Sequence, residues 1–341
     1  MAMNSLFASE ERERKLDRIG DPLAALEATV DFQAIADRVA ALLPKADYRK
    51  GGRPPFPILL MIKLWVIKQL YNLSDDQVEY QSLDRVTLQR FLGLQSSSRI
   101  PDSKTFWVFQ QTLLSVGAAP VIAEAVQQQR AVAGYIARNG PWIDARIIRA
   151  PIQHFTQAEK AMLDRGEVPA EWSPAKRAQK DLQARWTKKH GKSYFGYKAH
   201  VSADVRYKLA RKSAVTVASV HDTQHFEDLL DETHTSREVS ADKGYVDGER
   251  EARLTEAGWR VKVPHKAKRG QPLSACQKGR NTRIAKVRAR VEHVFAGLHH
   301  MGRQEIRTIG LARAPLQITT KWAVYHLKRW VSRRKCGMTA F

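Results

Sequence analysis

The sequence is poor in cysteine and has no long apolar run, and both shortages narrow what the protein can be. Its 341 residues include two cysteines, Cys276 and Cys336, which lie far apart and form no CxxC pair. These two residues indicate neither a disulfide framework nor a cysteine-based zinc site, so we expect free thiols in a reducing compartment. No apolar run reaches the roughly 18 residues that a membrane span requires, and the first residues lack the pattern of a signal peptide. We therefore expect a cytoplasmic protein and no membrane partner.

Acidic residues are also scarce relative to basic ones. The chain has 57 Lys and Arg against 35 Asp and Glu, a formal net charge of +22. From Arg260 onward, 20 Lys and Arg accompany two acids, Glu292 and Glu305. Such a charge implies a polyanionic partner, with nucleic acid as the first candidate and an anionic membrane surface as the second. Hydrophobic residues make up 43% of the chain, enough for a sizeable core, and the length suggests two domains.

The first part of the chain has the periodicity of helices. We predict a charged arm at residues 1–22 and a helical DNA-binding domain at residues 23–138. Within this domain, helices between residues 56 and 92 fit either a helix-turn-helix or an ordinary bundle, and the residues leave both open. In the first case the last of these helices would read DNA through Arg85 and Arg90.

After residue 138 the pattern changes to short β-branched runs that alternate with helices. We predict a catalytic domain at residues 139–335, whose order of three strands followed by helix, strand, helix, strand and helix is that of an RNase H-like mixed sheet. Three segments of this domain stand apart from its core. They are a helical or irregular insertion at 156–190, a basic loop at 265–281 and a basic C-terminal helix at 312–335.

Three acidic residues have contexts that fit one active site. Asp144 interrupts a β-branched strand, Asp242 ends another strand, and Glu292 lies on a helix among arginines. Carboxylates held close together repel one another and need a counter-charge, usually a divalent cation. We therefore predict that the three acids are catalytic and hold two Mg²⁺ ions, for which Mn²⁺ would substitute, to break a phosphodiester. The alternatives are an outward-facing strand Asp, a helix N-cap and an intrahelical Arg–Glu pair.

Basic and aromatic residues near these acids are candidates for DNA contacts. Some lie on strands beside Asp144, and others lie next to Asp242 or on the helix of Glu292. An aromatic side chain among lysines suits stacking on an unpaired base, although Trp186 could equally anchor the insertion to the core. The predicted contacts in this domain are Trp186, Lys188, Lys189, Lys198, His200, Lys243, Arg288 and His299.

Several segments together resemble a known family. The sequence is similar to bacterial insertion-sequence transposases of the DDE type, and more closely to insertion-sequence family five. The similar segments lie between residues 55 and 330 and are LSDDQVEYQSLDRVTLQRFLGL, IPDSKTFWVF, DARII, ARWTKKHGKSYFGYKAHVSAD, TVASVHDT, SADKGY, RVEHVF and IRTIGLARA. Related families carry Tyr, Arg, Glu and Lys at fixed spacing on the last helix. Arg288 and Glu292 match that pattern, whereas Ala285 and His299 stand at the Tyr and Lys places.

The resemblance implies a transposase whose catalytic acids are Asp144, Asp242 and Glu292. Its helical part would bind the terminal inverted repeats of its insertion sequence, and its activity would be metal-dependent cleavage and strand transfer of double-stranded DNA. We expect a homodimer in the DNA complex and a location in the bacterial cytoplasm at the nucleoid. Two alternatives stay open. They are an RNase H-like DNA nuclease that cuts without joining, and a DNA-binding regulator that has lost catalysis.

Overall fold

The structure is a computed structural model, and contacts divide it into two compact units. It describes residues 7–44, 51, 54–95, 99–135, 140–205, 207–231, 236–267, 270–302 and 305–336. One unit comprises Met1–Tyr135 with Ala323–Phe341, and the other comprises Ile136–Trp322. The last helix, α13 (Arg313–Lys335), begins in the second unit and ends in the first. The predicted domain boundary between residues 138 and 139 lies outside the described residues, as do residues 268–269 of the predicted basic loop and residues 1–6 of the predicted arm.

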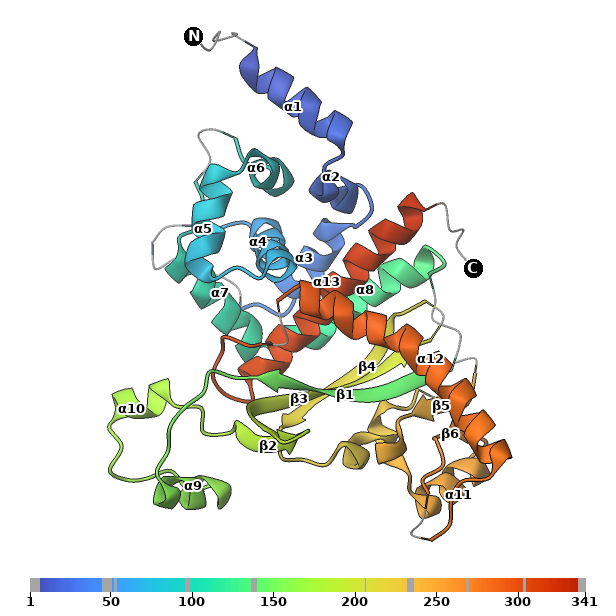
Figure 1. The fold of residues 1–341 in the computed structure, drawn as a ribbon. Coiled ribbons are helices and arrows are strands. Elements are labelled where there is room, and N and C mark those ends of the chain that lie inside the picture. The colour runs from blue at the N-terminus through green and yellow to red at the C-terminus, as the bar shows by residue number, and fades with distance from the viewer. Residues whose placement is uncertain are drawn as a thin grey trace, which may run out of the picture. The chain divides into compact units, whose positions relative to one another are not determined.

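The first unit is helical throughout the residues described (Figure 1). Its most buried helix is α4, which is apolar on nearly every side, and Ile62, Leu64 and Ile67 are no more than 1% exposed. Because such a helix has no polar face, it must be surrounded by other helices, and α3, α5 and α6 all pack on it. The helices of this unit besides α13 are α1 (Ala8–Ile19), α2 (Pro22–Glu27), α3 (Phe32–Ala40), α4 (Ile58–Tyr71), α5 (Asp75–Asp84), α6 (Val86–Leu92), α7 (Ser103–Ser115) and α8 (Ala118–Val132).

Capping residues set the ends of these helices. Ser74 and Gln77 form a capping box at the start of α5, and Gly93 ends α6 in a left-handed conformation. The apolar residues of segment 24–43 recur at the spacing of one helix, but this segment contributes to two helices, α2 and α3. The break occurs at Asp31, whose side chain accepts a hydrogen bond from the amide of Ala34 at 2.9 Å and so starts α3.

Among the described residues, no single helix has the length and apolar character of a membrane span. The helices α7 and α8 meet that description only when taken together, and they are bent by 87° where they join.

The second unit contains a six-stranded mixed sheet. The strand order is β2-β3-β1-β5-β6, and β4 also pairs with β3. The central strand β1 runs antiparallel to β3 and parallel to β5, and β5 runs parallel to β6. The strands are β1 (Pro141–Arg149), β2 (Arg185–Lys189), β3 (Lys192–Asp204), β4 (Ala210–Val217), β5 (Glu238–Ala241) and β6 (Arg260–Lys262). The mixed sheet following a helical region confirms the coarse fold prediction.

Helices and short 3-10 turns surround the sheet. The α-helices are α9 (Gln157–Asp164), α10 (Pro174–Gln179), α11 (Gly248–Glu256) and α12 (Ala275–His300), and the 3-10 helices are η2 (Asp222–His225), η3 (Glu227–Leu229) and η4 (Lys243–Tyr245). The segment after His221 forms the two short 3-10 helices η2 and η3 rather than an α-helix. The basic loop predicted at 265–281 ends earlier, because Ser274 and Gln277 form a capping box that starts α12 at Ala275. The final residues of the predicted insertion, 185–189, belong to the sheet as β2.

The register between β1 and β3 defines two faces of the sheet. Asp144 lies opposite Val201, whereas its neighbour Ala145 lies opposite His200. Cross-strand partners share a face and successive residues alternate, so Asp144 and Arg146 point one way and His200 points the other. We call the first the α12 face, because Arg146 contacts α12 there. The second is the η face, where Ile143 packs in a core cluster with residues of η3 and η4.

Candidate active site

The three predicted acids lie close together on the α12 face. The parallel pairing of Ile143 with Ala241 places the next residues, Asp144 and Asp242, beside each other at the end of β5. Helix α12 brings the third acid, and Arg288 connects two of them. Its Nη1 lies 3.1 Å from Oδ2 of Asp242, and its Nε lies 3.7 Å from Oε1 of Glu292. Residues about 150 positions apart in the sequence therefore form one cluster.

A second arginine belongs to this cluster, although the sequence analysis did not single it out. Arg146 donates a hydrogen bond through Nη2 to Oε2 of Glu292, and its guanidinium lies 4.7 Å from the ring centre of Phe295. Phe295 follows Glu292 by three residues, so both side chains lie on the same side of α12. The two-residue spacing between Asp144 and Arg146 is the sequence signal that points to it, because residues i and i+2 of a strand share a face.

The electrostatics of the cluster centre on Asp144. Burial raises the pKa of its carboxyl, and the nearby charge of Glu292 acts in the same direction. The charges of Arg146 and Arg288 and the hydrogen bond from the amide of Ala145, at 2.8 Å, oppose that rise. The ionised form of Asp144 is therefore unfavourable here unless positive charge lies nearby.

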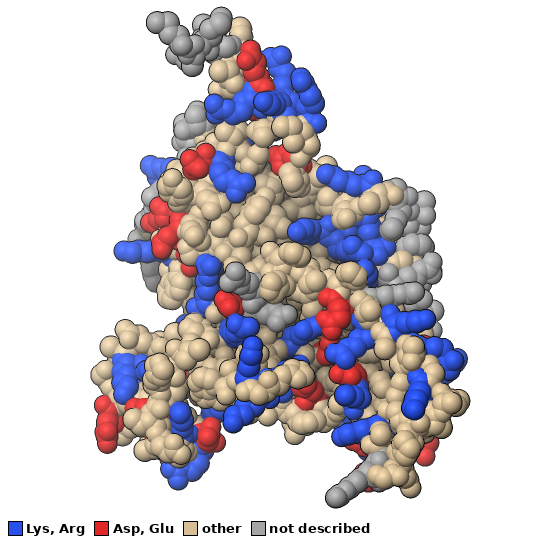
Figure 2. Space-filling view, in the orientation of Figure 1, with Lys and Arg blue, Asp and Glu red and all other residues tan. Residues whose placement is uncertain are grey.

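The cluster is open to solvent. The side chains of Asp242, Glu292 and Arg288 are 31%, 42% and 40% exposed. In Figure 2, Lys and Arg side chains gather where Figure 1 draws α12, and acidic side chains lie among them. Asp242 also fulfils the alternative considered for it, since it caps η4 by accepting from the amide of Lys243 at 2.7 Å. Lys243 itself is exposed beside it.

The side chains of the cluster pair with cations in this structure. Within the parts of the chain that the structure describes, no three His, Cys, Asp or Glu side chains are arranged to hold a metal ion. The two arginines supply the positive charge instead. The residue types still suit a hard cation, because carboxylate oxygens are the ligands that Mg²⁺ prefers.

Other predicted DNA contacts of this unit lie at the surface. Lys188, Lys189 and His299 are exposed, and Trp186 is 40% exposed with its ring centre 5.4 Å from that of Phe195. Trp186 therefore packs on the sheet and keeps an accessible part, so both of its predicted roles stay open.

Lys198 and His200 lie on the η face, away from Asp144. His200 is fully buried, with Nε2 2.9 Å from Oγ1 of Thr216, and burial lowers its pKa to about 4. Lys198 is largely buried, and its Nζ lies 2.8 Å from Oδ1 of Asp222. The DNA contact predicted for His200 is therefore not supported, because alternation along β3 turns the residue into the core. A DNA contact through Lys198 would require its ion pair to break.

Two further predicted contacts lie in the helical unit. Arg85 precedes α6, stacks 5.2 Å from the ring centre of Tyr71 and donates to Gln81 at 3.2 Å. Arg90 pairs with Asp17 of α1 at 2.8 Å. Both arginines thus have partners within their own unit, and their contact with DNA stays a prediction.

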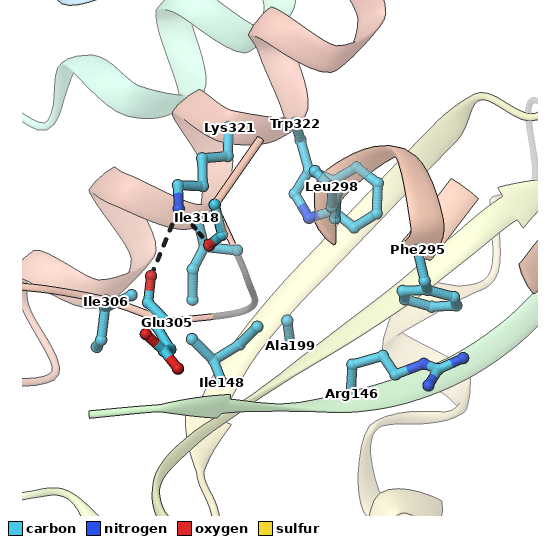
Figure 3. A pocket seen from close by; sticks show the side chains of 11 residues that line it. Arg146, Ile148, Ala199, Phe295, Leu298, Glu305, Ile306, Ile318, Lys321 and Trp322 are labelled. Carbon is cyan, nitrogen blue, oxygen red and sulfur yellow. Dashed lines mark hydrogen bonds between the residues drawn. The ribbon is translucent and has the colours of Figure 1, made fainter. Parts of the chain in front are cut away.

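An apolar cavity adjoins the acids on the α12 face. Figure 3 shows Arg146 at one end, the side chains of Phe295, Leu298 and Trp322 along it, and Lys321 at the other end. The cavity is small, about 30 Å³. Lys321 points its Nζ toward the carbonyl oxygens of Gly302 and Glu305, each 3.4 Å away, and burial lowers its pKa to about 8. Residues of α13 and of β1, the strand that carries Asp144, line this cavity together.

Comparisons with known proteins assign a family to this arrangement. The profile described as "Transposase domain (DUF772)" matches residues 10–112, and the profile described as "Transposase DDE domain" matches residues 142–327. Among solved structures, the chain is similar to the cryo-EM structure of the piggyBac transposase synaptic complex with hairpin DNA. The identity is 11% and the TM-score 0.49, over 96% of this chain and 78% of that chain. The resemblance to an insertion-sequence DDE transposase is confirmed by the profiles, whereas membership of family five stays a prediction. Since the second profile covers more than half of its residues, the chain belongs to the DDE transposase family.

Proposed function

We propose that this transposase binds the terminal inverted repeats of its insertion sequence and catalyses metal-dependent cleavage and strand transfer of DNA, with Asp144, Asp242 and Glu292 as catalytic residues. The observation that carries this proposal is the convergence of the three acids from β1, the end of β5 and α12. Arg288 lies within 4 Å of two of them. The three acids, which are separated by about 100 and about 50 residues in the sequence, come together at a solvent-accessible place. The chain also belongs to a family whose members act on DNA.

The sheet supports an RNase H-like fold for the second unit. Reading from β4 through β3, β1 and β5 to β6, the first three strands are antiparallel and the last two run parallel to β1. When β2 is not counted, β1 is the first strand and is central, and β5 is the fourth strand and lies beside it, which is the strand order of that fold. The catalytic acids of such a fold would lie at the junction of those two strands, where Asp144 and Asp242 are found.

The three acids fit a pair of divalent cations by their chemistry. They offer oxygen ligands only, and Asp144 is desolvated enough to need a neighbouring positive charge. We propose Mg²⁺, with Mn²⁺ substituting, held by Asp144, Asp242 and Glu292. When bound, two such ions lower the pKa of an attacking water or 3′ hydroxyl and stabilise the leaving oxygen.

The chain's own residues would orient the substrate. Arg146 and Arg288 now pair with the acids, and each guanidinium carries five donors, more than those contacts use. They would bind the phosphate next to the acids, because a planar guanidinium matches two phosphate oxygens. Phe295 fixes the plane of Arg146 by stacking, which orients it toward α12. The exposed Lys243 and Lys188 would hold neighbouring phosphates.

The test uses labelled DNA that carries the ends of the element, with the wild-type protein and Glu292→Gln, in Mg²⁺ and in EDTA. The matched control is Glu305→Gln, which removes the other acid of the basic C-terminal region. Glu305 lies 3.8 Å from Arg149, outside the cluster. We expect cleavage at the ends in Mg²⁺ for the wild type and Glu305→Gln and for neither protein in EDTA. We expect no cleavage by Glu292→Gln.

The same assay separates the alternatives. Cleaved ends that join to a target duplex indicate a transposase, whereas cleaved ends that never join indicate a nuclease of the same fold. Binding to the ends without cleavage by any variant would contradict the catalytic assignment and favour a DNA-binding regulator. Joining requires two ends, so we also propose a homodimer on double-stranded DNA. We propose a bacterial cytoplasmic location, where that DNA lies.

A further inference from the structure

The predicted insertion of the second unit is fixed to the rest of that unit by a buried carboxylate. Asp181 is 1% exposed and accepts hydrogen bonds from the hydroxyl of Tyr197 at 2.7 Å and from the amide of Gly310 at 3.1 Å. Next to it, Gln183 accepts from the amide of Leu311 at 2.7 Å. Because a buried carboxylate is costly without such partners, these bonds hold the insertion and the start of α13 in one arrangement.

A pocket lies between these two segments. Its volume is about 470 Å³, which is in the range of small-molecule sites. One wall comes from α9, α10 and the residues before β2, and the other comes from residues 309–313. Gly310 and Gln183, which take part in the bonds described above, line the pocket, so hydrogen bonds to backbone amides fix its two walls relative to each other.

The charges that line the pocket are mainly positive. The cations are Arg177, Lys180, Arg185 and Arg313, and the one acidic lining residue is Glu167. That acid also lies 3.6 Å from Arg165, which is outside the lining. The pocket therefore carries an excess of positive charge.

The four cations differ in what they already bind. Arg185 is committed to the fold, because it pairs with Asp164 at 3.0 Å and donates to the carbonyl of Leu163. Lys180 donates to the carbonyl of His154 at 3.2 Å, a neutral acceptor. No carboxylate within the described part of the chain pairs with Arg177 or Lys180. Arg313, on the other wall, donates to the carbonyl of Ile309 at 3.2 Å. On the wall that the insertion forms, Arg177 and Lys180 are therefore the cations with charge to offer an anion.

We propose that this pocket binds a phosphate group of the DNA backbone, with Arg177 and Lys180 as the contacts. The inference rests on the proposed function for the identity of the anion. It assigns the insertion a role as a second anchor for the DNA, separate from the catalytic acids.

Strand geometry gives the distance from Asp144 to Arg185, the lining residue of the pocket that belongs to the sheet. Arg185 pairs with Gly196, and Gly196 pairs with Arg149, which is five residues beyond Asp144 on β1. Five residues along a strand and two strands across amount to about 16 Å and about 10 Å, and therefore to roughly 20 Å in all. A duplex rises about 3.4 Å per base pair, so a phosphate bound at this pocket lies several base pairs from the cleaved one.

The test measures DNA affinity in a catalytically inactive background, so that it does not depend on cleavage. Glu292→Gln protein, with and without Arg177→Gln/Lys180→Gln, is titrated with fluorescent end DNA in EDTA at several salt concentrations. The matched control is Arg253→Gln/Arg260→Gln, which removes two exposed charges on α11 and β6. We expect the pocket variant to bind about tenfold more weakly and to lower the salt slope by about one to two, and the control to change affinity less than about threefold.

Two further arms make the result decisive. Arg177→Lys/Lys180→Arg preserves the charge and should bind within about threefold of the parent, which separates loss of charge from loss of folding. Ethylation of single phosphates should interfere at a position several base pairs from the cleavage position in the parent and no longer in the pocket variant. Equal losses for the pocket and control variants would overturn the proposal. A second result would also overturn it: inorganic phosphate raises the melting temperature only of proteins with an intact pocket, while the pocket variant binds DNA as tightly as the parent. The ligand would then be free phosphate. Failure of the proposed function would instead appear as absent cleavage by the wild type.

Discussion

The two faces of the central sheet both bury polar side chains, but they differ in how the charges are balanced. On the η face, Lys198 pairs with Asp222 and the neutral His200 binds Thr216, so the charges cancel. On the α12 face, two arginines lie beside three carboxylates, so the cluster has an excess of negative charge. The charges of the η face are therefore balanced, whereas the α12 face needs further positive charge.

Solvent access follows the same division. The side chains of Asp242 and Glu292 are about a third or more exposed, while Lys198 is 13% and His200 fully buried. A buried polar group is thus poor evidence for a functional site when its partners satisfy it. Unbalanced charge at an open position is the better indicator in this protein.

Asp144→Asn tests the α12 face and should have the largest effect. It keeps the shape of the side chain and removes its charge, so we expect DNA cleavage to fall by at least about a thousandfold. Because the ionised carboxylate is disfavoured by burial, the melting temperature should change little. Cleavage of labelled end DNA and a thermal melt measure the two. A variant that still cuts would remove Asp144 from the catalytic set.

Lys198→Met tests the η face and should affect stability rather than activity. It leaves Asp222 without its cation, which should cost about 2 kcal/mol of unfolding free energy, less than for a fully buried pair because Asp222 is 34% exposed. Urea unfolding measures this cost. The double variant Lys198→Met/Asp222→Asn should recover part of it. A loss of DNA affinity without loss of stability would instead restore the predicted contact of Lys198 with DNA.

The pH dependence of stability should report His200. Its pKa is about 4 in the folded protein against about 6.5 when unfolded, so the unfolded chain binds the proton more readily. The contribution of neutral His200 to the free energy of unfolding is therefore complete above pH 6.5 and is lost as the pH falls toward 4. Between pH 7 and pH 5 we expect a loss of about 2 kcal/mol. Urea unfolding of wild type and His200→Gln at both pH values tests it, and equal losses in the two proteins would contradict the assignment.

Tyr245→Phe should have the smallest effect, and it tests whether the η face contributes to DNA cleavage. The hydroxyl of Tyr245 is buried, and no hydrogen-bond partner for it lies in the described part of the chain. Removing it should leave stability unchanged or raise it by up to about 1 kcal/mol, with cleavage within about threefold of wild type. A large loss of cleavage would show that the η face takes part in the chemistry.

Much of the secondary structure could be predicted because local rules decide it. The capping box of Ser74 and Gln77 and the glycine stop at Gly93 act within one turn of chain, so the sequence alone indicates both. A capping box of the same kind at Ser274 and Gln277 starts α12 at Ala275, within the basic loop predicted at 265–281. The two helices in place of one near Asp31 are a further case where a cap overrides a continuous apolar pattern.

The sequence by itself determined the composition of the site. It placed Asp144, Asp242 and Glu292 on a strand, a strand end and a helix, and concentrated basic charge around the last of them. Only the tertiary structure decided which cations meet these acids. Alternation along a strand shows that Asp144 and Arg146 share a face and that neighbours such as Ala145 take the other, but it does not show which face α12 will cover. That choice depends on packing between residues about 150 positions apart. For this reason Arg146 joins the acids and His200, one strand away, lies in the core.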